Sequence, residues 1–335
     1  MHILIVKLGA LGDVVRTSYF AKRLKEKHKK LRLSWITEKN AVPLLESNPY
    51  IDDIWTDFKE CQEHQFSIIY SLDDEVDTVK LVSGLNTHKI VGAYYDFIKE
   101  VVTYDDSAAS WFDMGLNSKH GKVWADQAKR ENKLSHGKIF SKIFQVEYPE
   151  PKIWMCSDVN YEMEAIEDDV PLIGINPYAG GRWASKELQE AELKRLIYYL
   201  LEAKDLIGLK GRLVLIGAGD DRLRNLRISQ EIDNPRIIIP NTDGSLAILA
   251  KVISKLNVLI TSDSLALHLA IAQKVPFIAF FSPTSAAEID DYDLGMKVLS
   301  TSADYCSYKK CVDNSSITAS RIFDCFTRMV NKLKS

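Results

Sequence analysis

The sequence predicts an α/β protein with two doubly wound parallel sheets. The chain has 335 residues, about the length of two domains. Short runs rich in β-branched residues alternate with helical patterns, as in parallel βαβ units. A proline-bearing break at residues 148–151 interrupts this alternation, which then restarts. We therefore expect a first domain at residues 1–150 and a second at residues 151–335.

The first half is expected to contain several strands and one long helix before the pattern weakens. A helix over residues 13–28 places Val14, Tyr19 and Leu24 on a core-facing stripe. The stretch 94–132 favours long loops with short helices, followed by a helix near residues 127–144. The expected strands are residues 3–6, 31–36, 51–55, 66–71 and 89–92.

The second half repeats the alternation. Its expected strands are residues 172–175, 212–216, 236–239, 258–261 and 277–281, and its expected helices are residues 188–205, 220–232, 245–256 and 264–272. A last helix at residues 317–333 either stays with the second domain or packs back on the first. Two such domains leave a cleft at the carboxyl ends of their strands, where ligands of open α/β sheets bind.

Composition excludes several classes of protein. A net charge of −3 argues against a nucleic-acid partner. No apolar run approaches the ~20 residues that span a bilayer, and the apolar start is too short for a signal-peptide core. The 5 cysteines are few and odd in number, which fits a reducing compartment. We expect a cytoplasmic protein with at most peripheral contact with the inner face of the cytoplasmic membrane.

The first candidate site is the turn between the first strand and the first helix. Gly9 and Gly12 allow a ligand to approach the backbone there. Their spacing differs from the GxGxxG and P-loop patterns, so it gives poor support for a dinucleotide site. Asp13 is either the cap of the helix or a catalytic carboxylate facing the cleft.

Two turns of the second domain have residue types that suit a nucleotide. A loop with glycines and cations at the end of a strand fits a phosphate-bearing ligand, although a surface turn with solvated charges has the same composition. Asp220 follows the next strand, where it would bind ribose hydroxyls or complement a helix dipole. The residues of the first loop are Gly180, Gly181, Arg182 and Lys186.

The strongest pattern follows the strand at residues 258–261. Asp263 and Ser264 open a helix there, and the amides of Ser264, Leu265 and Ala266 form a natural pyrophosphate site. His268 lies one turn beyond Ser264 and shares its face. A histidine in a helix is usually part of the core, but this one is close to an anion-binding helix start.

Together these segments resemble the heptosyltransferases, family 9 of the glycosyltransferases. Residues 7–14 are similar to the family's opening Lys and Gly-Asp-Val, and residues 176–186 to its Asn-Pro loop ending in Lys. Residues 263–272 are similar to Asp-Thr-Gly-x-x-His-Leu-Ala-Ala-Ala, and residues 281–284 to Phe-Gly-Pro-Thr. The resemblance covers most of the chain and is weakest over residues 95–165.

The resemblance implies a GT-B fold of two Rossmann-like domains, the first binding the acceptor and the second the nucleotide sugar. It implies an inverting, metal-independent transfer of a sugar, heptose from ADP-heptose, to a hydroxyl of a glycan, lipid-linked or lipopolysaccharide-core acceptor, with no cofactor. Asp13 matches the general base, and Lys186 matches the residue that steadies the leaving diphosphate. The donor-binding residues would be Gly12, Gly180, Gly181, Arg182, Asp220, Asp263, Ser264, Leu265 and His268.

Some features depart from the family or leave alternatives open. Leu265 stands where the family has glycine, so we expect a narrower space around the donor sugar. Cys306 and Cys311 have no fourth zinc ligand at a sensible spacing and are interpreted as structural or incidental, with a metal site as the alternative. The alternative functions are a nucleotide-sugar 2-epimerase of similar architecture and a non-catalytic sugar-nucleotide-binding protein. Asp13 and Lys186 favour transfer over simple binding, because binding needs no base.

Overall fold

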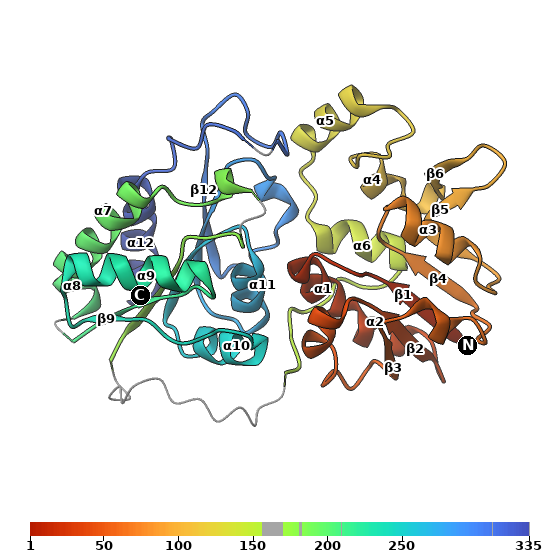
Figure 1. Cartoon of the computed structure of the whole chain (residues 1–335), viewed down its shortest axis with the longest axis horizontal. Coiled ribbons are helices and arrows are strands. Elements are labelled where there is room, and N and C mark those ends of the chain that lie inside the picture. Colours follow the sequence, from red (N-terminus) through yellow and green to blue (C-terminus); the bar gives the residue numbers. More distant parts are fainter. Residues whose placement is uncertain (156–169, 181–182, 209, 310, 335) are drawn as a thin grey trace. The chain divides into compact units, whose positions relative to one another are not determined.

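The computed structural model describes residues 1–155, 170–180, 183–208, 210–309 and 311–334 (Figure 1). The chain divides into two compact units. Unit 1 comprises Met1–Met155 with Ala287–Asp290, and unit 2 comprises Cys156–Ala286 with Asp291–Ser335. The short segment Ala287–Asp290 therefore belongs to unit 1, although the chain on either side of it belongs to unit 2.

Unit 1 is built on a six-stranded sheet in the order β3-β2-β1-β4-β5-β6, counted over its described residues. The five strands that the sequence predicts are all present and parallel, and β6 is antiparallel to β5. The strands are β1 (His2–Val6), β2 (Arg32–Ile36), β3 (Asp53–Trp55), β4 (Ile68–Ser71), β5 (Ile90–Asp96) and β6 (Val101–Tyr104).

Three expectations for unit 1 were wrong or incomplete. The helix expected at 13–28 is two helices that meet at Tyr19, and the helix expected near 127–144 is also two, because the Ser135 side chain caps a new start. The stretch 94–132, expected to be long loops with short helices, has the short helices but also an unpredicted hairpin. Asp96 closes the turn of this hairpin by accepting from the amides of Ile98 and Lys99. The helices are α1 (Leu11–Ser18), α2 (Phe20–Lys27), α3 (Val76–Ser83), α4 (Ala109–Phe112), α5 (Lys122–Glu131), α6 (His136–Phe144), η1 (Lys39–Leu44), η2 (Phe58–Cys61) and η3 (Asp106–Ala108).

Unit 2 has a six-stranded, fully parallel sheet in the order β12-β11-β10-β7-β8-β9, again over its described residues. The five predicted strands are present, and β12 was not predicted. The strands are β7 (Leu172–Asn176), β8 (Arg212–Leu215), β9 (Ile237–Ile238), β10 (Val258–Ser262), β11 (Phe277–Phe281) and β12 (Gly295–Leu299).

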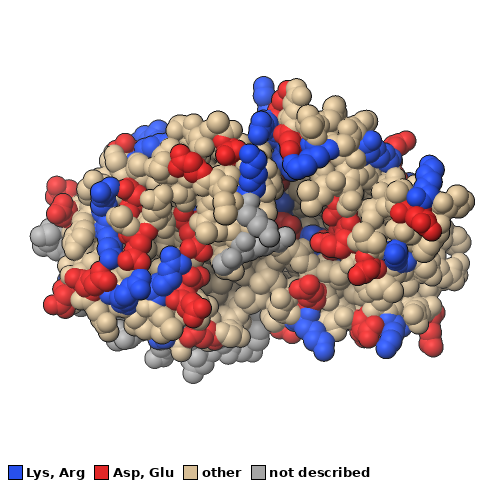
Figure 2. All heavy atoms as spheres, turned by 45° about the horizontal axis from the view of Figure 1, so that its top comes forward, with Lys and Arg blue, Asp and Glu red and all other residues tan. Residues whose placement is uncertain are grey.

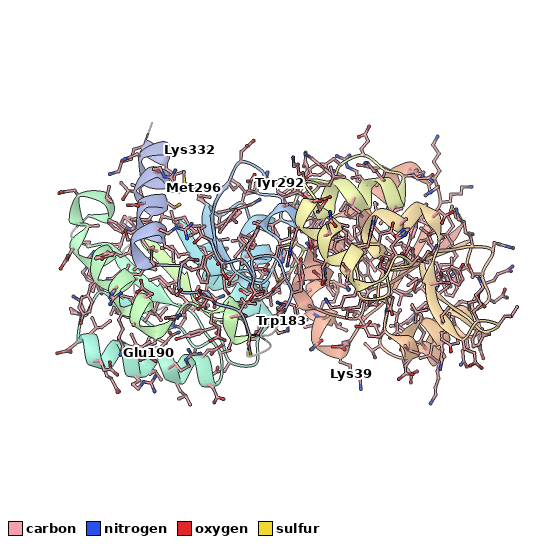
Figure 3. The ribbon with its side chains drawn as sticks, turned by 90° about the horizontal axis from the view of Figure 1, so that it is seen from above. Lys39, Trp183, Glu190, Tyr292, Met296 and Lys332 are labelled. Carbon is pink, nitrogen blue, oxygen red and sulfur yellow. The ribbon has the colours of Figure 1, made fainter. Side chains whose placement is uncertain are left out.

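The helices of unit 2 cover its sheet much as the sequence predicts. They are α7 (Glu190–Glu202), α8 (Lys204–Ile207), α9 (Asp220–Ile232), α10 (Leu246–Ser254), α11 (Leu265–Ala272), α12 (Ala319–Lys334) and η4 (Ala184–Lys186). The short helix η5 (Ala286–Glu288) lies mostly in the segment Ala287–Asp290 of unit 1. The last helix, α12, packs on α7, β11 and β12 of its own unit. Figure 3 shows Lys332 of α12 and Met296 of β12 on the same side of this unit.

Each sheet has one point where the strand order reverses. In unit 1 the chain runs outward from β1 through β2 to β3 and then returns to β4 on the other side of β1. In unit 2 it runs from β7 to β9 and returns to β10 on the other side of β7. Loops diverge at such switch points, so the carboxyl ends of β1 and β4, and of β7 and β10, are where each sheet would bind a ligand.

No described helix is long and apolar enough to cross a membrane. Figure 2 shows acidic and basic side chains intermixed over much of the visible face.

Candidate active site

The switch point of unit 1 holds a buried ion pair. Lys7 directly follows β1, and its ammonium contacts the carboxylate of Asp73, which follows β4. Asp73 also accepts a hydrogen bond of 2.5 Å from the amide of Leu8, so it binds both the side chain and the backbone of the β1–α1 turn. Burial alone would lower the pKa of Lys7, but Asp73 and Asp13 offset this and raise that pKa above its ordinary value. Lys7 is therefore an ammonium.

Asp13 lies beside this pair in the first turn of α1. The helix cap is Ala10, which has no side-chain hydrogen bond, so the interpretation of Asp13 as the N-cap was wrong. Asp13 Oδ1 is 2.9 Å from Arg16 Nη2, and Asp13 Oδ2 is 3.8 Å from Lys7 Nζ. The carboxylate is thus held between two cations, yet its side chain remains 32% exposed.

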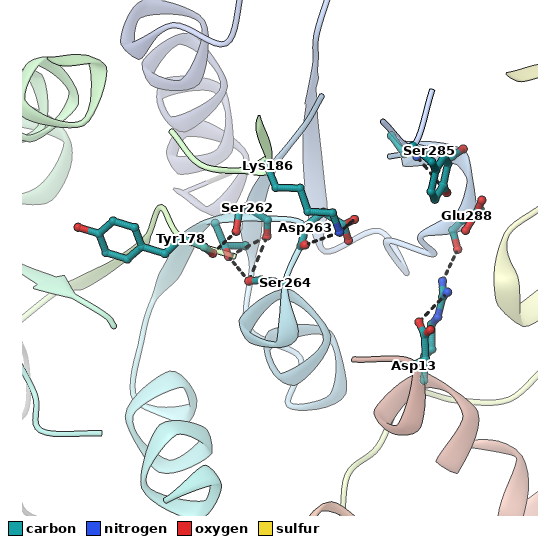
Figure 4. Close-up of polar contacts among 12 residues, drawn as sticks. Asp13, Tyr178, Lys186, Ser262, Asp263, Ser264, Ser285 and Glu288 are labelled. Atoms are coloured by element: carbon teal, nitrogen blue, oxygen red, sulfur yellow. Dashed lines mark hydrogen bonds and ion pairs between the residues drawn. The ribbon is translucent and has the colours of Figure 1, made fainter. Parts of the chain in front are cut away.

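Arg16 is fixed in turn by other parts of unit 1. Its guanidinium lies 5.6 Å from the centre of the Trp111 ring and donates to the carbonyl oxygen of Glu288 at 3.5 Å. In Figure 4, dashed lines join both Asp13 and Glu288 to the guanidinium of Arg16. The same short segment accepts a hydrogen bond from the Gly137 amide through Asp290, at 3.1 Å. The segment Ala287–Asp290 therefore helps to fix the surroundings of Asp13.

The switch point of unit 2 also holds an ion pair. Lys186 Nζ is 2.9 Å from Asp263 Oδ2 and donates to the Asp263 carbonyl at 3.2 Å (Figure 4). Burial would raise the pKa of Asp263, but Lys186 and His268 more than offset this and lower that pKa to about 2. Lys186 also lies 5.3 Å from the centre of the Trp183 ring, which is labelled in Figure 3.

The start of α11 has the geometry of an anion site. Ser264 is the N-cap, but its hydroxyl makes no capping bond and instead accepts from the amide of Asn176 at 2.9 Å. Asn176 also donates to Thr261 at 3.2 Å, so side chains from the ends of β7 and β10 join across the switch point. Because Ser264 leaves the first amides of α11 uncapped, they can meet the charge of a phosphate.

The other predicted donor residues lie in different surroundings. Gly180 adopts a left-handed φ of 66°, which favours glycine, whereas Gly181 and Arg182 lie outside the described residues. Leu265 is half-buried, and His268 is buried one turn further along α11. Asp220 is exposed in the first turn of α9, and Gly12 lies in the first turn of α1.

Sequence reasoning missed several polar residues that shape these turns. Asp73 and Arg16 were given no role, although both act on the surroundings of Asp13. In unit 2, Asp243 accepts from the Gly219 amide at 2.6 Å and Thr242 donates to the Gly217 carbonyl at 2.9 Å, which fixes the loop before α9. A carboxylate directly after a buried strand, as at Asp73, was the available signal.

Among the described residues no group of three or more His, Cys, Asp and Glu side chains could hold an ion. Cys306 is buried and Cys311 is exposed.

The two parallel-sheet units define the fold class as α/β of the two-domain GT-B type. The sequence model of glycosyltransferase family 9 (heptosyltransferase) matches residues 58–317. The chain belongs to this family and is a glycosyltransferase. No curated protein sequence matches it.

Solved structures share the fold over nearly the whole chain. A family 9 glycosyltransferase from Veillonella parvula has a TM-score of 0.69 at 16% identity, covering 99% of this chain and 97% of that one. The E. coli ADP-heptose lipopolysaccharide heptosyltransferase II has a TM-score of 0.68 at 14% identity, covering 100% of both chains. E. coli heptosyltransferase WaaC with ADP has a TM-score of 0.63 at 16% identity, covering 99% of both.

Proposed function

We propose that the enzyme transfers heptose from ADP-heptose to a hydroxyl of a lipopolysaccharide-core or related glycan acceptor, with inversion and without a metal. Family membership supports the transfer reaction. The ADP in the WaaC structure, and the ADP-heptose named for heptosyltransferase II, support the choice of donor. The reaction would take place in the cytoplasm, with at most peripheral contact with the membrane.

Unit 2 would bind the donor. The observation that carries this proposal is the uncapped start of α11, with Lys186 and Asp263 beside it at the switch point. The diphosphate would accept hydrogen bonds from the amides of Leu265 and Ala266. Asp220 would bind a ribose hydroxyl, and Gly180, Gly181 and Arg182 would form the neighbouring loop.

Lys186 would stabilise the leaving group. As the glycosidic bond breaks, negative charge grows on the departing ADP, and a fixed cation lowers the energy of that state. Asp263 is ionised through the physiological pH range, because its pKa is about 2. It therefore keeps the ammonium at the head of α11 before the donor arrives, so less reorganisation is needed during the reaction.

Unit 1 would bind the acceptor, and Asp13 would take its proton. A general base must be ionised and reachable, and the Asp13 carboxylate is paired with cations while part of it remains exposed. The acceptor oxygen would attack the anomeric carbon from the face opposite ADP. The proton would pass to Asp13, and the products would be the glycoside of inverted configuration and ADP.

Purified enzyme with ADP-heptose and a heptose-free lipopolysaccharide-core acceptor tests this proposal. We expect stoichiometric ADP and a new glycoside whose anomeric configuration, measured by NMR, is opposite to that of the donor. GDP- and UDP-sugars serve as controls, and a thermal-shift screen should rank ADP-heptose first. Turnover of a UDP-sugar in the absence of acceptor would instead support epimerisation.

A further inference from the structure

The Lys7–Asp73 ion pair of unit 1 is almost fully buried. Both side chains are nearly inaccessible, at 11% and 7% exposed. Burying two charges costs desolvation energy that their attraction often fails to recover, so such a pair is weak evidence for a stabilising role. This pair lies at the switch point, directly beside the proposed catalytic carboxylate of Asp13. Positioning of that carboxylate explains the pair better than stabilisation of the fold does.

The contacts of Asp73 fix the whole β1–α1 turn. One oxygen holds the Lys7 ammonium and the other accepts from the Leu8 amide. The carbonyl of Leu8 accepts in turn from the amide of Glu38 and from the hydroxyl of Thr37, each at 3.2 Å. The turn that leads into α1 is therefore bound on both sides, and the place of Asp13 in the first turn of that helix is fixed with it.

The charged groups of Asp73, Lys7 and Asp13 alternate in sign. Lys7 Nζ lies between the carboxylates of Asp73 and Asp13, in contact with the first and 3.8 Å from the second. A lone ammonium at that distance would hold Asp13 in place but would also make it a weaker base, because it stabilises the ionised form. Asp73 carries the opposite charge against Lys7 and therefore opposes this second effect.

We propose that Lys7 and Asp73 are positioning residues for the base: Lys7 orients the carboxylate of Asp13, and Asp73 neutralises Lys7 so that Asp13 remains basic. This proposal rests on the proposed role of Asp13. Arg16 on α1, the Glu288 carbonyl that accepts from Arg16, and Glu75 near the pair are further charged and polar groups in these surroundings. They are the same in every variant compared below.

The test is the pH dependence of kcat/KM for heptosyl transfer in Lys7→Met and Asp73→Asn. Removing the ammonium should move the acid limb of the profile to higher pH, and removing the Asp73 charge should move it to lower pH. The shift in Lys7→Met should be about one pH unit or more, because Lys7 Nζ is 3.8 Å from Asp13 Oδ2, and the opposite shift in Asp73→Asn should be smaller. Both variants should lose about 10- to 100-fold in kcat, because the base is displaced or weakened. Their affinity for ADP, which unit 2 would bind, should be unchanged by calorimetry.

The double variant Lys7→Met/Asp73→Asn guards against poor folding of either single variant, since it leaves no unpaired buried charge. Its acid limb should return close to that of the wild type while kcat stays low. Lys25→Met on α2 is a matched control, because it breaks another ion pair of unit 1, that of Lys25 with Asp52. It should leave the profile unchanged.

Two results separate the possible failures. If both single variants lose activity with unmoved acid limbs, or shift in the same direction, the pair is merely structural and this inference is wrong. If Asp13→Asn retains activity within a few-fold of wild type, the proposed role of Asp13 itself fails. A large loss in Asp13→Asn with wild-type kinetics in Lys7→Met would overturn only the positioning role.

Discussion

Replacing Lys186 by methionine should destabilise unit 2 in a way that depends on pH. The substitution keeps most of the length of the side chain but leaves Asp263 without its nearest cation. Asp263 has a pKa of about 2, against an ordinary value of 3.8. At about 1.36 kcal/mol for each pH unit, this difference corresponds to about 2 kcal/mol of stability at neutral pH.

The sign of the pH dependence follows from the two pKa values. In the wild type this contribution is complete above pH 3.8 and is lost as the pH falls towards about 2. In Lys186→Met, burial without the cation should raise the pKa of Asp263 above its ordinary value. The carboxylate then costs stability at neutral pH and ceases to do so once it is protonated.

Urea denaturation followed by circular dichroism at pH 7.5 and pH 4.5 measures this effect. We expect Lys186→Met to lose about 2 kcal/mol or more at the higher pH and distinctly less at the lower. Lys186→Met/Asp263→Asn should recover part of the loss at pH 7.5. Lys194→Met, which breaks an exposed ion pair of α7 with Glu231, serves as a control without such dependence. An equal loss at both pH values would refute the reasoning.

Three further predictions concern catalysis and the donor pocket. Asp13→Asn keeps the size of the side chain and removes the proton acceptor, so kcat should fall by about 10² to 10⁴ with ADP affinity unchanged by calorimetry; activity within a few-fold of wild type would contradict the role. Transfer should persist in excess EDTA, and complete loss restored by magnesium or manganese would contradict a metal-independent mechanism. Leu265→Gly should widen the range of donors accepted at a stability cost of about 1 kcal/mol, because this side chain is only half-buried; a cost of about 2 to 5 kcal/mol would show that it belongs to the core.

The strands were more predictable than the helices. Ile3, Leu4 and Ile5 in β1, and the whole of β11, are buried on both faces, which gives the continuous apolar runs that identify parallel strands. Helix ends depend on single residues, and Ser135 restarts a helix where periodicity alone suggests continuity. β12 was missed because its side chains are mostly half-buried and mixed in polarity.

The residues of the candidate site also differ in how well the sequence predicts them. The motif residues Asp13, Lys186 and Asp263 lie at turns that a sequence pattern can indicate, because local spacing defines them. The partner of Lys7 could not be predicted in this way, since Asp73 is 66 residues away and becomes a neighbour only through the pairing of β1 with β4. Which strands are adjacent is decided by packing of the whole sheet.

Both units pair a lysine with a carboxylate at the switch point of the sheet. A lysine near buried surface tends to lose its proton, because burial disfavours the charged form. Lys7 in unit 1 and Lys186 in unit 2 each lie against a carboxylate that follows a central strand, Asp73 after β4 and Asp263 after β10. The carboxylate holds the lysine in place, and in unit 1 it raises the pKa of Lys7 above its ordinary value. The negative charge of the carboxylate also offsets the positive charge of the lysine at longer distances. The lysine can therefore contact a neighbouring group while the net charge around it stays close to zero. If Asp13 is the general base, this arrangement would preserve its proton affinity. If Lys186 stabilises the leaving diphosphate, the cation would already be in place before the donor binds. An enzyme organised in this way would depend on each carboxylate as much as on its lysine, so Asp263→Asn should impair turnover even though Asp263 itself cannot donate to a phosphate.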